Sequence, residues 1–502
     1  MTTRCWHVGC RMLHRMRRRL FIASTACCLL AAACGSTGPG LTASRSDDAT
    51  AAVISLPDPG VTTPPPSSVV PNPNNAVIDF GDNKPPQPYD DFLQASLADI
   101  QDYWRTTFPE VYGKPFTDLT GGIWASYPKR TPAVPNGCSG RPDEEYVAQG
   151  NAFYCRNGDY MAYDDFDLIP TLTKAFGDSA VGVVFAHEFG HAIQARVGVL
   201  KDNPVVYKEQ QSDCFAGAWT AHVARGESPY LKFGDGDIKA GLSAMVAVKD
   251  GKLGVDVYSG RAHGTAFDRV GAFENGFKGG AAACKEMETN PLPLLNLQFS
   301  DQKEQQSNGN LAYMEIGPYV VKDLTRFWSG TFTANKLTFK PPTVSSYPHA
   351  GPFPKCDGIS DSQYPFEALY CTSTNSVVYD EDYAQALYNK FGDFSVGYIL
   401  SNAWSDGVQT QLGSGLTGEP RALINECLTG AWTKDIVPPL SGTLGDQAYI
   451  SPGDLDEAVE TALLTGDQSI SGNVMGSAFE KIDNFRAGVL GGIQECNKRI
   501  TG

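Results

Sequence analysis

The segment Ser179–Val197, SAVGVVFAHEFGHAIQARV, sets the strongest limits on this chain, because it carries His187, Glu188 and His191 in the spacing H-E-x-x-H. In an α-helix, residues four positions apart lie on the same face, so both imidazoles can reach one metal ion. Most other side chains of the segment are apolar, which predicts a buried helix. A buried His-Glu-His set needs a partner that offsets its desolvation, and a metal ion is such a partner.

The same residues indicate a particular chemistry. Two neutral imidazoles and one further protein ligand leave Zn²⁺ with an open position for water, as in catalytic zinc sites. Zinc lowers the pKa of that water toward roughly 7, and Glu188 can take its proton as the oxygen attacks a carbonyl. The motif therefore predicts hydrolysis of peptide bonds. With 7 His in 502 residues it should arise by accident in about 0.005 of such chains, so a chance match on a core helix is the weaker interpretation.

The third ligand is expected in the next helical segment, KEQQSDCFAGAW, which starts at Lys208. Glu209 and Asp213 stand four residues apart on one face of that helix. We assign Glu209 as the third ligand and Asp213 as the carboxylate that orients one of the histidines, although the sequence also permits the exchange of these roles. His222 is a rival ligand, but it lies about 140° from Glu209 around the same helix, which favours a structural histidine.

Around these residues the chain resembles a known family. HEFGHAIQ followed by EQQSDCFAGAW, with NAFYC before and HGTAFDRVGAFENGF after, is similar to the bacterial neutral zinc metallopeptidases, and the E-x-x-x-D pairing resembles that of gluzincins. The resemblance covers roughly residues 89–284. It implies zinc held by His187, His191 and Glu209, with Glu188 as general base. The substrate that it implies is a peptide or protein, without further detail.

His263 opens the segment HGTAFDRVGAFENGF and permits two interpretations. As a catalytic residue it would donate a hydrogen bond to the oxyanion that forms during attack, a role that gluzincins commonly give to His or Tyr. As a structural residue it would only make a contact at the start of a helix. The sequence is compatible with both.

The N-terminus indicates export. Residues 1–19 hold six Arg and no acid, an apolar run follows, and AAAC ends at Cys34, which is typical of a lipoprotein signal peptide over residues 1–33. We expect a lipid on Cys34, with simple secretion as the alternative, and Arg18-Arg19 permits twin-arginine as well as Sec export. The apolar run is too short to span a bilayer. The sequence thus predicts an extracytoplasmic protein whose N-terminal lipid anchors it to the bacterial cell membrane.

Residues 34–88 are rich in Pro, Ser, Thr and Gly, which predicts a partly extended tether, with ordered packing of residues 77–80 as the alternative. Removal of the six Arg with the signal peptide changes the formal net charge from −16 to about −22. A surface this acidic repels nucleic acid, so we expect no nucleic-acid partner.

Internal similarity divides the rest of the chain. YDDFDLIPTLTKAFGDSAVGVVFAHEFGHAIQARVG, from Tyr163, returns as YDEDYAQALYNKFGDFSVGYILSNAWSDGVQTQLG, from Tyr379. SDCFAGAW returns as NECLTGAW, and HGTAFDRVGAFENGF returns as MGSAFEKIDNFRAGV. This repetition predicts two tandem copies of one metallopeptidase-like domain, residues 89–290 and 305–502. We expect an α+β, helix-rich, zincin-like fold with a small sheet near residues 120–165.

The second copy keeps scaffold residues and loses the ligands. Asn402 and Asp406 replace the two histidines, Ala403 replaces the glutamate between them, and Ala422 replaces the third ligand. An amide and a carboxylate alone do not make an ordinary zinc site. We therefore expect a degenerate repeat that is catalytically inactive.

Eight cysteines follow Cys34, and an even number in an exported chain indicates disulfides. Four cysteines in each copy allow three pairings, and from these we choose Cys138 with Cys155, Cys214 with Cys284, Cys356 with Cys371, and Cys427 with Cys496. Cys214 as a metal ligand is the alternative. It is disfavoured because Cys427 persists where the other ligands are gone.

Two classes of function fit the sequence. The first is a membrane-anchored, extracytoplasmic zinc metallopeptidase. The second is a cell-envelope module for peptide binding, scaffolding or assembly, in which zinc is structural and the second copy is a binding pseudoenzyme. The effect of Glu188→Ala on peptide cleavage separates them.

Overall fold

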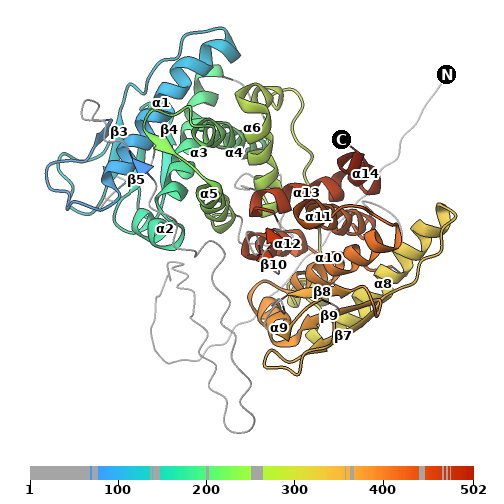
Figure 1. Cartoon of the computed structure of the whole chain (residues 1–502). Helices are drawn as coiled ribbons and strands as arrows, with labels where there is room; N and C mark the ends of the chain where they lie inside the picture. Colours follow the sequence, from blue (N-terminus) through green and yellow to red (C-terminus); the bar gives the residue numbers. More distant parts are fainter. Residues whose placement is uncertain are drawn as a thin grey trace, which may run out of the picture. The chain divides into compact units, whose positions relative to one another are not determined.

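Two successive runs of strands and helices make up the described part of the chain (Figure 1). All of it belongs to the unit Ala52–Gly502. The computed structural model describes residues 68–69, 77–135, 138, 147–198, 203–249, 264–356, 358–361, 364, 367–439, 447–465, 469–470, 473–474 and 476–501. The expected signal peptide and Cys34 lie outside these residues.

The first run is a small sheet covered by helices. Its elements are β1 (Ser68–Val69), β2 (Ile78–Asp79), α1 (Asp90–Tyr112), β3 (Ile123–Ser126), β4 (Ala152–Cys155), β5 (Tyr160–Asp164), α2 (Leu168–Phe176), α3 (Asp178–Val197), α4 (Val205–Ala224), β6 (Leu231–Lys232), α5 (Asp235–Ala247) and α6 (Ala266–Glu286). The strand order is β2-β3-β5-β4, with β4 antiparallel to β5 and the other pairs parallel. β4 is therefore an edge strand of this sheet.

The second run also places a small sheet between helices. It consists of α7 (Gln302–Gln306), α8 (Tyr313–Ala334), β7 (Thr343–Tyr347), β8 (Ala368–Cys371), β9 (Ser376–Asp380), α9 (Glu381–Lys390), α10 (Asp393–Gln411), α11 (Gly418–Asp435), α12 (Asp454–Thr465), β10 (Ser469–Ile470), β11 (Asn473–Val474), α13 (Ala478–Gly491) and α14 (Ile493–Thr501). Its sheet has the order β7-β9-β8, again with one parallel and one antiparallel pair. The chain is thus helix-rich with small sheets, as the sequence predicts for an α+β protein.

A buried hydrogen bond between a long helix, α1 or α8, and a tryptophan occurs in both runs. In the first, the indole Nε1 of Trp219 donates to Asp99 Oδ2 at 2.8 Å, and in the second Trp432 donates to Asp323 Oδ2 at 2.9 Å. All four side chains are buried. A hydrogen bond to a buried carboxylate contributes about 1.5–3 kcal/mol, so each bond fixes α1 or α8 against the following helices.

The described residues contain four disulfides, and their pairing is the one chosen from the sequence. They join Cys138 to Cys155, Cys214 to Cys284, Cys356 to Cys371, and Cys427 to Cys496. The disulfides of Cys155 and Cys371 join a strand to a loop, and those of Cys214 and Cys427 join two helices. Because Cys214 is bonded to Cys284, its thiolate is not offered to a metal in this structure.

Residues 77–79, within the segment expected to be a tether, pack on the fold. Ile78 is 5% exposed and lies in β2, which pairs with β3. The side chain of Gln94 in α1 accepts from the backbone N–H groups of Val77 (2.9 Å) and Ile78 (3.2 Å). Strand pairing and one buried apolar side chain therefore hold residues 77–79 on the fold, in line with the alternative of ordered packing left open above. The boundary at residue 88 stays a prediction.

The two runs pack against each other through α5 and α6 on one side and α12 and α13 on the other (Figure 1). Arg486 of α13 is central: its guanidinium lies 4.1 Å from the ring centroid of Phe267, donates to the Phe267 carbonyl, and pairs with Glu274 at 3.2 Å. Nearby, the Phe267 N–H donates to Asp456 Oδ1 at 3.1 Å. These groups are buried, so the contact between α6 and the second run excludes solvent.

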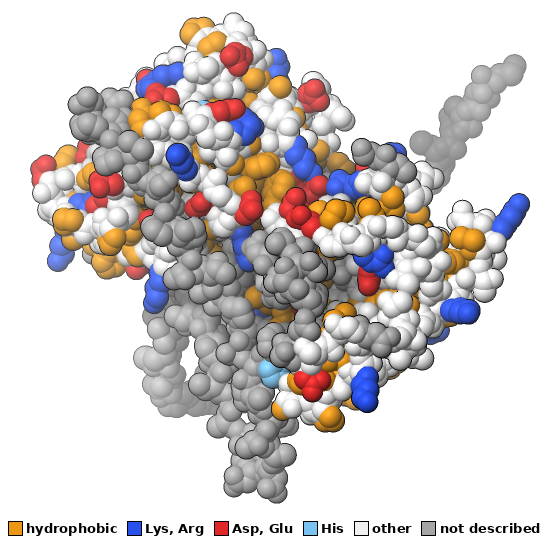
Figure 2. Space-filling view, viewed as in Figure 1, with side chains coloured by type: hydrophobic (Ala, Val, Ile, Leu, Met, Phe, Trp, Pro, Cys, Tyr) orange, Lys and Arg blue, Asp and Glu red, His pale blue; other side chains and the backbone are white. Residues whose placement is uncertain are grey.

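The surface is mixed in charge. Figure 2 shows Lys, Arg, Asp and Glu side chains scattered over the viewed face among polar and apolar ones. Within the described residues, no helix combines the length and the apolar character needed to cross a bilayer.

Candidate metal centre

The histidine helix α3 and the glutamate helix α4 approach each other closely at Gly190, between the two histidines of the motif. A Cβ at this position would lie 2.4 Å from Ser212 Oγ, so only glycine lets α4 pack here without a shift. The Ser212 hydroxyl also donates to the carbonyl of His187. The glycine of the motif therefore brings the helix that carries Glu209 against the histidines.

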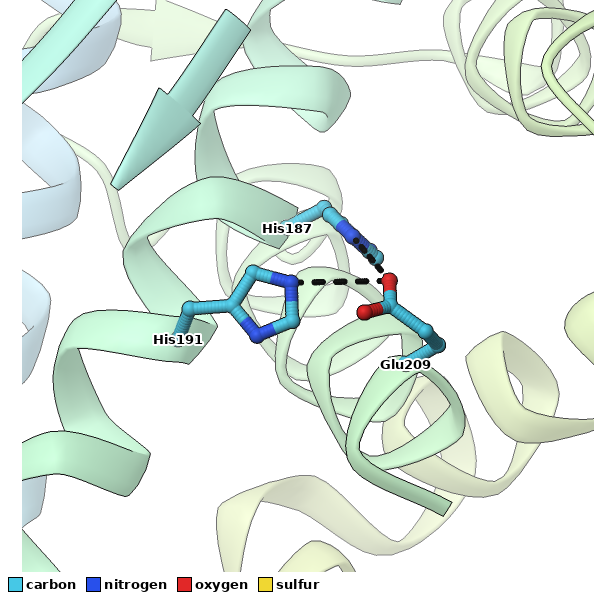
Figure 3. Close-up of side chains that lie close together, drawn as sticks. All are labelled: His187, His191 and Glu209. Atoms are coloured by element: carbon cyan, nitrogen blue, oxygen red, sulfur yellow. Dashed lines mark ion pairs between the residues drawn. The ribbon is translucent and has the colours of Figure 1, made fainter. Parts of the chain in front are cut away.

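His187, His191 and Glu209 meet at this crossing (Figure 3). Glu209 Oε2 lies 3.3 Å from His187 Nε2 and 3.5 Å from His191 Nε2. In a tetrahedral zinc site with ligand distances of about 2.0–2.1 Å, two ligand atoms are about 3.4 Å apart. The spacing of these nitrogen and oxygen atoms, and their chemical type, therefore fit zinc.

A buried carboxylate contacts His187. Its Nδ1 lies 2.6 Å from Asp213 Oδ1, so the Nδ1 proton is directed to the carboxylate and Nε2 faces Glu209. Asp213 is fully buried, and Arg269 of α6 holds it with two hydrogen bonds, from Nε at 2.9 Å and from Nη2 at 2.8 Å. Asp213 thus lies in hydrogen-bond contact with His187, and its orienting role stays a prediction.

His191 is oriented through an amide. Its Nδ1 lies 3.1 Å from Gln194 Oε1, and Gln194 Nε2 donates to the Lys208 carbonyl at 2.7 Å. The bond to Lys208 joins the end of α3 to the start of α4, one residue before Glu209. Gln194 therefore fixes both the ring of His191 and the position of the third candidate ligand.

The electrostatics of the cluster favour a cation. Burial lowers the pKa of His187, but Asp213 and Glu209 outweigh burial and raise it to about 10. For His191, burial again lowers the pKa, and Glu209 reverses the effect. Burial raises the pKa of Glu209, and the two histidines lower it far below its usual value. The protein thus stabilises positive charge at the point where the three side chains meet, and a divalent metal supplies such charge.

Glu188 lies beside the cluster rather than within it. The cluster's three ligand atoms come from the other residues, and Glu188 is only partly buried. Desolvation raises its pKa, while His187, His191 and a backbone hydrogen bond from Tyr154 lower it, with a net increase. Because Tyr154 belongs to the edge strand β4, the carboxyl group faces both the histidines and this strand.

The other sequence predictions have different outcomes. His222 stays away from the cluster and lies 3.1 Å from Glu227, as expected for a structural histidine. His263 lies outside the described residues, so its proposed catalytic role stays a prediction. The contact of Arg269 with Asp213 was not predicted from the sequence, because the two residues are 56 positions apart and form no local pattern. The internal repetition could have indicated Arg269, since the corresponding position of the second copy also holds a basic residue, Lys481.

The corresponding place in the second run holds an ion pair. Arg421 Nε bonds to Asp406 Oδ1, and its Nη2 donates to the Asp406 carbonyl at 2.8 Å. Asp406 stands where His191 stands in the first run, and Ala422 follows directly after Arg421. A guanidinium group therefore supplies the positive charge here.

Replacement of Asp213 by Asn should weaken zinc binding about 10–100-fold, because the neutral amide no longer makes His187 more basic. The measurement is competition for zinc against a chromogenic chelator, on protein shown to be folded by circular dichroism. Glu426→Gln is the matched control, since Glu426 has the equivalent buried position on α11 and should leave zinc affinity unchanged. Folded Asp213→Asn with wild-type zinc affinity would contradict the orienting role.

Comparison with known proteins points to the same region. Residues 82–287 match the family model described as "Putative neutral zinc metallopeptidase". Uncharacterized protein Rv2575 of Mycobacterium tuberculosis is 35% identical over 153 residues, which cover 26% of this chain and 52% of the relative. Uncharacterized protein YpfJ of Escherichia coli is 33% identical over 153 residues, with the same shares of both chains. The chain thus spans about half the length of these relatives, and no solved structure gives a significant match.

The family model covers the first run from α1 to α6, without β1 and β2, and ends before the second run. Its zinc cofactor agrees with the donor set of two imidazoles and one carboxylate. Residues 82–287 are therefore similar to the neutral zinc metallopeptidases, a family whose cofactor is zinc.

Proposed function

We propose that the first run of elements is a zinc-dependent peptidase. The observation that carries the proposal is the crossing of α3 and α4, where His187, His191 and Glu209 converge with Glu188 beside them. A structural zinc site is usually closed by four protein ligands, whereas three ligands with a free carboxylate alongside are the composition of a hydrolytic site.

Each residue of the site has a separate role in the proposed hydrolysis. Zinc, when bound by His187, His191 and Glu209, supplies an electrophilic centre that makes a water molecule nucleophilic near neutral pH. Glu188 accepts the proton of the attacking water at its carboxylate and then donates it to the leaving amine. Asp213 keeps His187 in the tautomer whose Nε2 is free to bind.

The edge strand β4 suits an extended peptide. It ends the strand order β2-β3-β5-β4, so one side of its backbone is not paired within this sheet. Peptides commonly bind by adding a strand to such an edge. Tyr154 links β4 to Glu188 and also lines a neighbouring pocket of about 280 Å³ together with Arg156 and Arg196. A peptide along β4 would thus pass the carboxylate and could place one side chain in this pocket.

The second run is proposed to be a degenerate copy of the first. Support comes from the small sheet between helices in each run, the two Trp–Asp hydrogen bonds and the equivalent disulfides. Asn402, Ala403 and Asp406 replace the catalytic motif, and the pair of Asp406 with Arg421 occupies the metal position. This copy then has no hydrolytic role.

Export and a lipid anchor complete the proposal. The four disulfides are typical of an oxidising compartment outside the cytoplasm. The signal-like residues 1–33 and Cys34 indicate a lipoprotein. The peptidase would then act on peptides or proteins of the bacterial envelope.

Removal and return of zinc test the proposed activity. Purified protein should digest unfolded casein and a mixed peptide library, lose digestion after treatment with 1,10-phenanthroline, and regain it with stoichiometric zinc. Cleaved termini are read by mass spectrometry. Zinc-loaded, folded protein that cleaves none of these substrates and shows no chelator-sensitive hydrolysis would contradict the proposal.

A further inference from the structure

Three buried acids meet in the second run, far along the sequence from the histidine motif. Asp393 begins α10, and Asp454 and Glu457 lie in the first turn of α12. One carboxylate oxygen from each lies within 4.8 Å of the others. Besides the histidine cluster, this is the one other group of potential metal ligands found among the described residues.

The backbone satisfies one oxygen of each acid. Asp393 Oδ2 accepts from the Leu311 N–H (2.8 Å), Asp454 Oδ2 from the Ser451 N–H (2.9 Å), and Glu457 Oε2 from the Phe394 N–H (2.8 Å). The second oxygens of Asp393 and Asp454, both named Oδ1, are buried without any hydrogen bond. The two residues are only 7% and 6% exposed. Each leaves a buried acceptor free, which destabilises the fold unless a ligand binds to it.

Both free oxygens belong to side chains that line one cavity of about 70 Å³. Ser451 lines the same cavity, and its hydroxyl donates to Glu304. A water molecule takes up about 30 Å³, so the space suits a small ion with one or two waters. Asp393 and Asp454 thus share a space of the right size, and Glu457 has a carboxylate oxygen within 4.8 Å of theirs.

No basic side chain neutralises the three acids among the described residues. Lys249 acts on Glu457 from a distance, but its ion pairs are with Asp456 at 3.4 Å and Glu460 at 2.8 Å. Burial, and then mutual repulsion for Asp454 and Glu457, raises the pKa of all three acids, that of Asp393 to about 6. Such a group needs added positive charge to keep its carboxylates ionised near neutral pH.

The first run offers a natural comparison. There Asp237 in α5 accepts from the Gly234 N–H, as Asp454 accepts from Ser451. The residue three positions after Asp237 is Ala240, whereas the residue three positions after Asp454 is Glu457. The second run therefore adds a third acid at a place where the same fold accommodates alanine.

We propose that Asp393, Asp454 and Glu457 bind a calcium ion that pins α12 to the start of α10. The ligands are all oxygen, which hard cations prefer and zinc does not. Two ligands of one calcium ion, each at about 2.4 Å, lie at most about 4.8 Å apart, as the three carboxylates do. This site needs neither the histidine motif nor the proposed peptidase activity.

The test is calcium binding to the full mature chain with its zinc site filled. Titration calorimetry should show one calcium ion per chain, and calcium should raise the melting temperature by several degrees. Glu457→Ala, which reproduces Ala240, should weaken calcium binding at least tenfold, and Glu457→Gln should do the same with less change of shape. Metal analysis should find zinc unchanged in both variants, while His191→Ala should lose zinc and keep calcium.

Glu426→Gln is the matched control, because it neutralises another buried acid of the second run and should keep wild-type calcium affinity. Wild-type protein that binds no calcium at millimolar concentration would overturn the proposal. So would calcium affinity unchanged by both Glu457 variants, or a gain in stability from Glu457→Gln without calcium binding, which would show that protons neutralise the acids. Tighter binding of magnesium than of calcium would overturn the choice of ion.

Discussion

Replacement of Glu188 by Ala should lower kcat/KM for peptide hydrolysis by about 10²–10⁴-fold or more, because general base catalysis by a positioned side chain contributes that much. Zinc should stay bound, since His187, His191 and Glu209 are untouched. The measurements are initial rates on a peptide identified in the casein digest, and zinc content by mass spectrometry of the same sample. Loss of cleavage with full zinc content is the expected pair of results.

The second run provides a structural control for this variant. Ala403 occupies the position of Glu188 in α10, and that helix is formed. The Glu188→Ala protein should therefore fold and melt close to the wild type. Hydrolysis at the wild-type rate in the folded variant would remove the peptidase proposal and leave the binding or assembly module of the sequence analysis.

Replacement of Glu209 by Ala should remove zinc and hydrolysis together. The change takes away one of three ligands, so zinc affinity should fall by more than the about 10–100-fold expected for an orienting residue such as Asp213. Ala422 shows that the corresponding helix tolerates alanine there. Zinc content after dialysis and the rate of peptide hydrolysis should fall in parallel, and full zinc content in the folded variant would contradict Glu209 as a ligand.

Variants at the corresponding positions of the second run serve as controls. Asn402→Ala and Asp406→Ala should keep zinc content and hydrolysis within about twofold of the wild type. Asp406→Ala breaks the ion pair with Arg421, which is partly exposed and so contributes little to stability. A folded Asp406→Ala protein without turnover would contradict the inactive role given to the second run.

The sequence predicted the parts of the candidate site that depend on helix periodicity. His187 and His191, and then Glu209 and Asp213, are pairs with a spacing of four, and the structure brings all four side chains together. The disulfide pairing was a choice among the three that four cysteines in each copy allow, and the structure has the chosen one. Both are local or repeated patterns, which a single sequence displays directly.

Contacts that depend on tertiary packing were not predicted. Arg269 reaches Asp213 from another helix, and Asp393 meets Asp454 only because α10 and α12 pack together. Composition also left open whether residues 77–80 pack on the domain, since it says nothing of a two-residue strand that pairs with β3. In each case the deciding interaction joins segments that carry no shared spacing.

Arg486 determines how much of the chain must be kept in any shortened protein. It covers Phe267, two residues before the arginine that holds Asp213, and it neutralises the buried Glu274. Truncation near residue 290, where the family match suggests a natural end, would expose an aromatic ring and leave a carboxylate buried without its cation. We therefore expect the first run expressed alone to be less stable than the chain that keeps both runs.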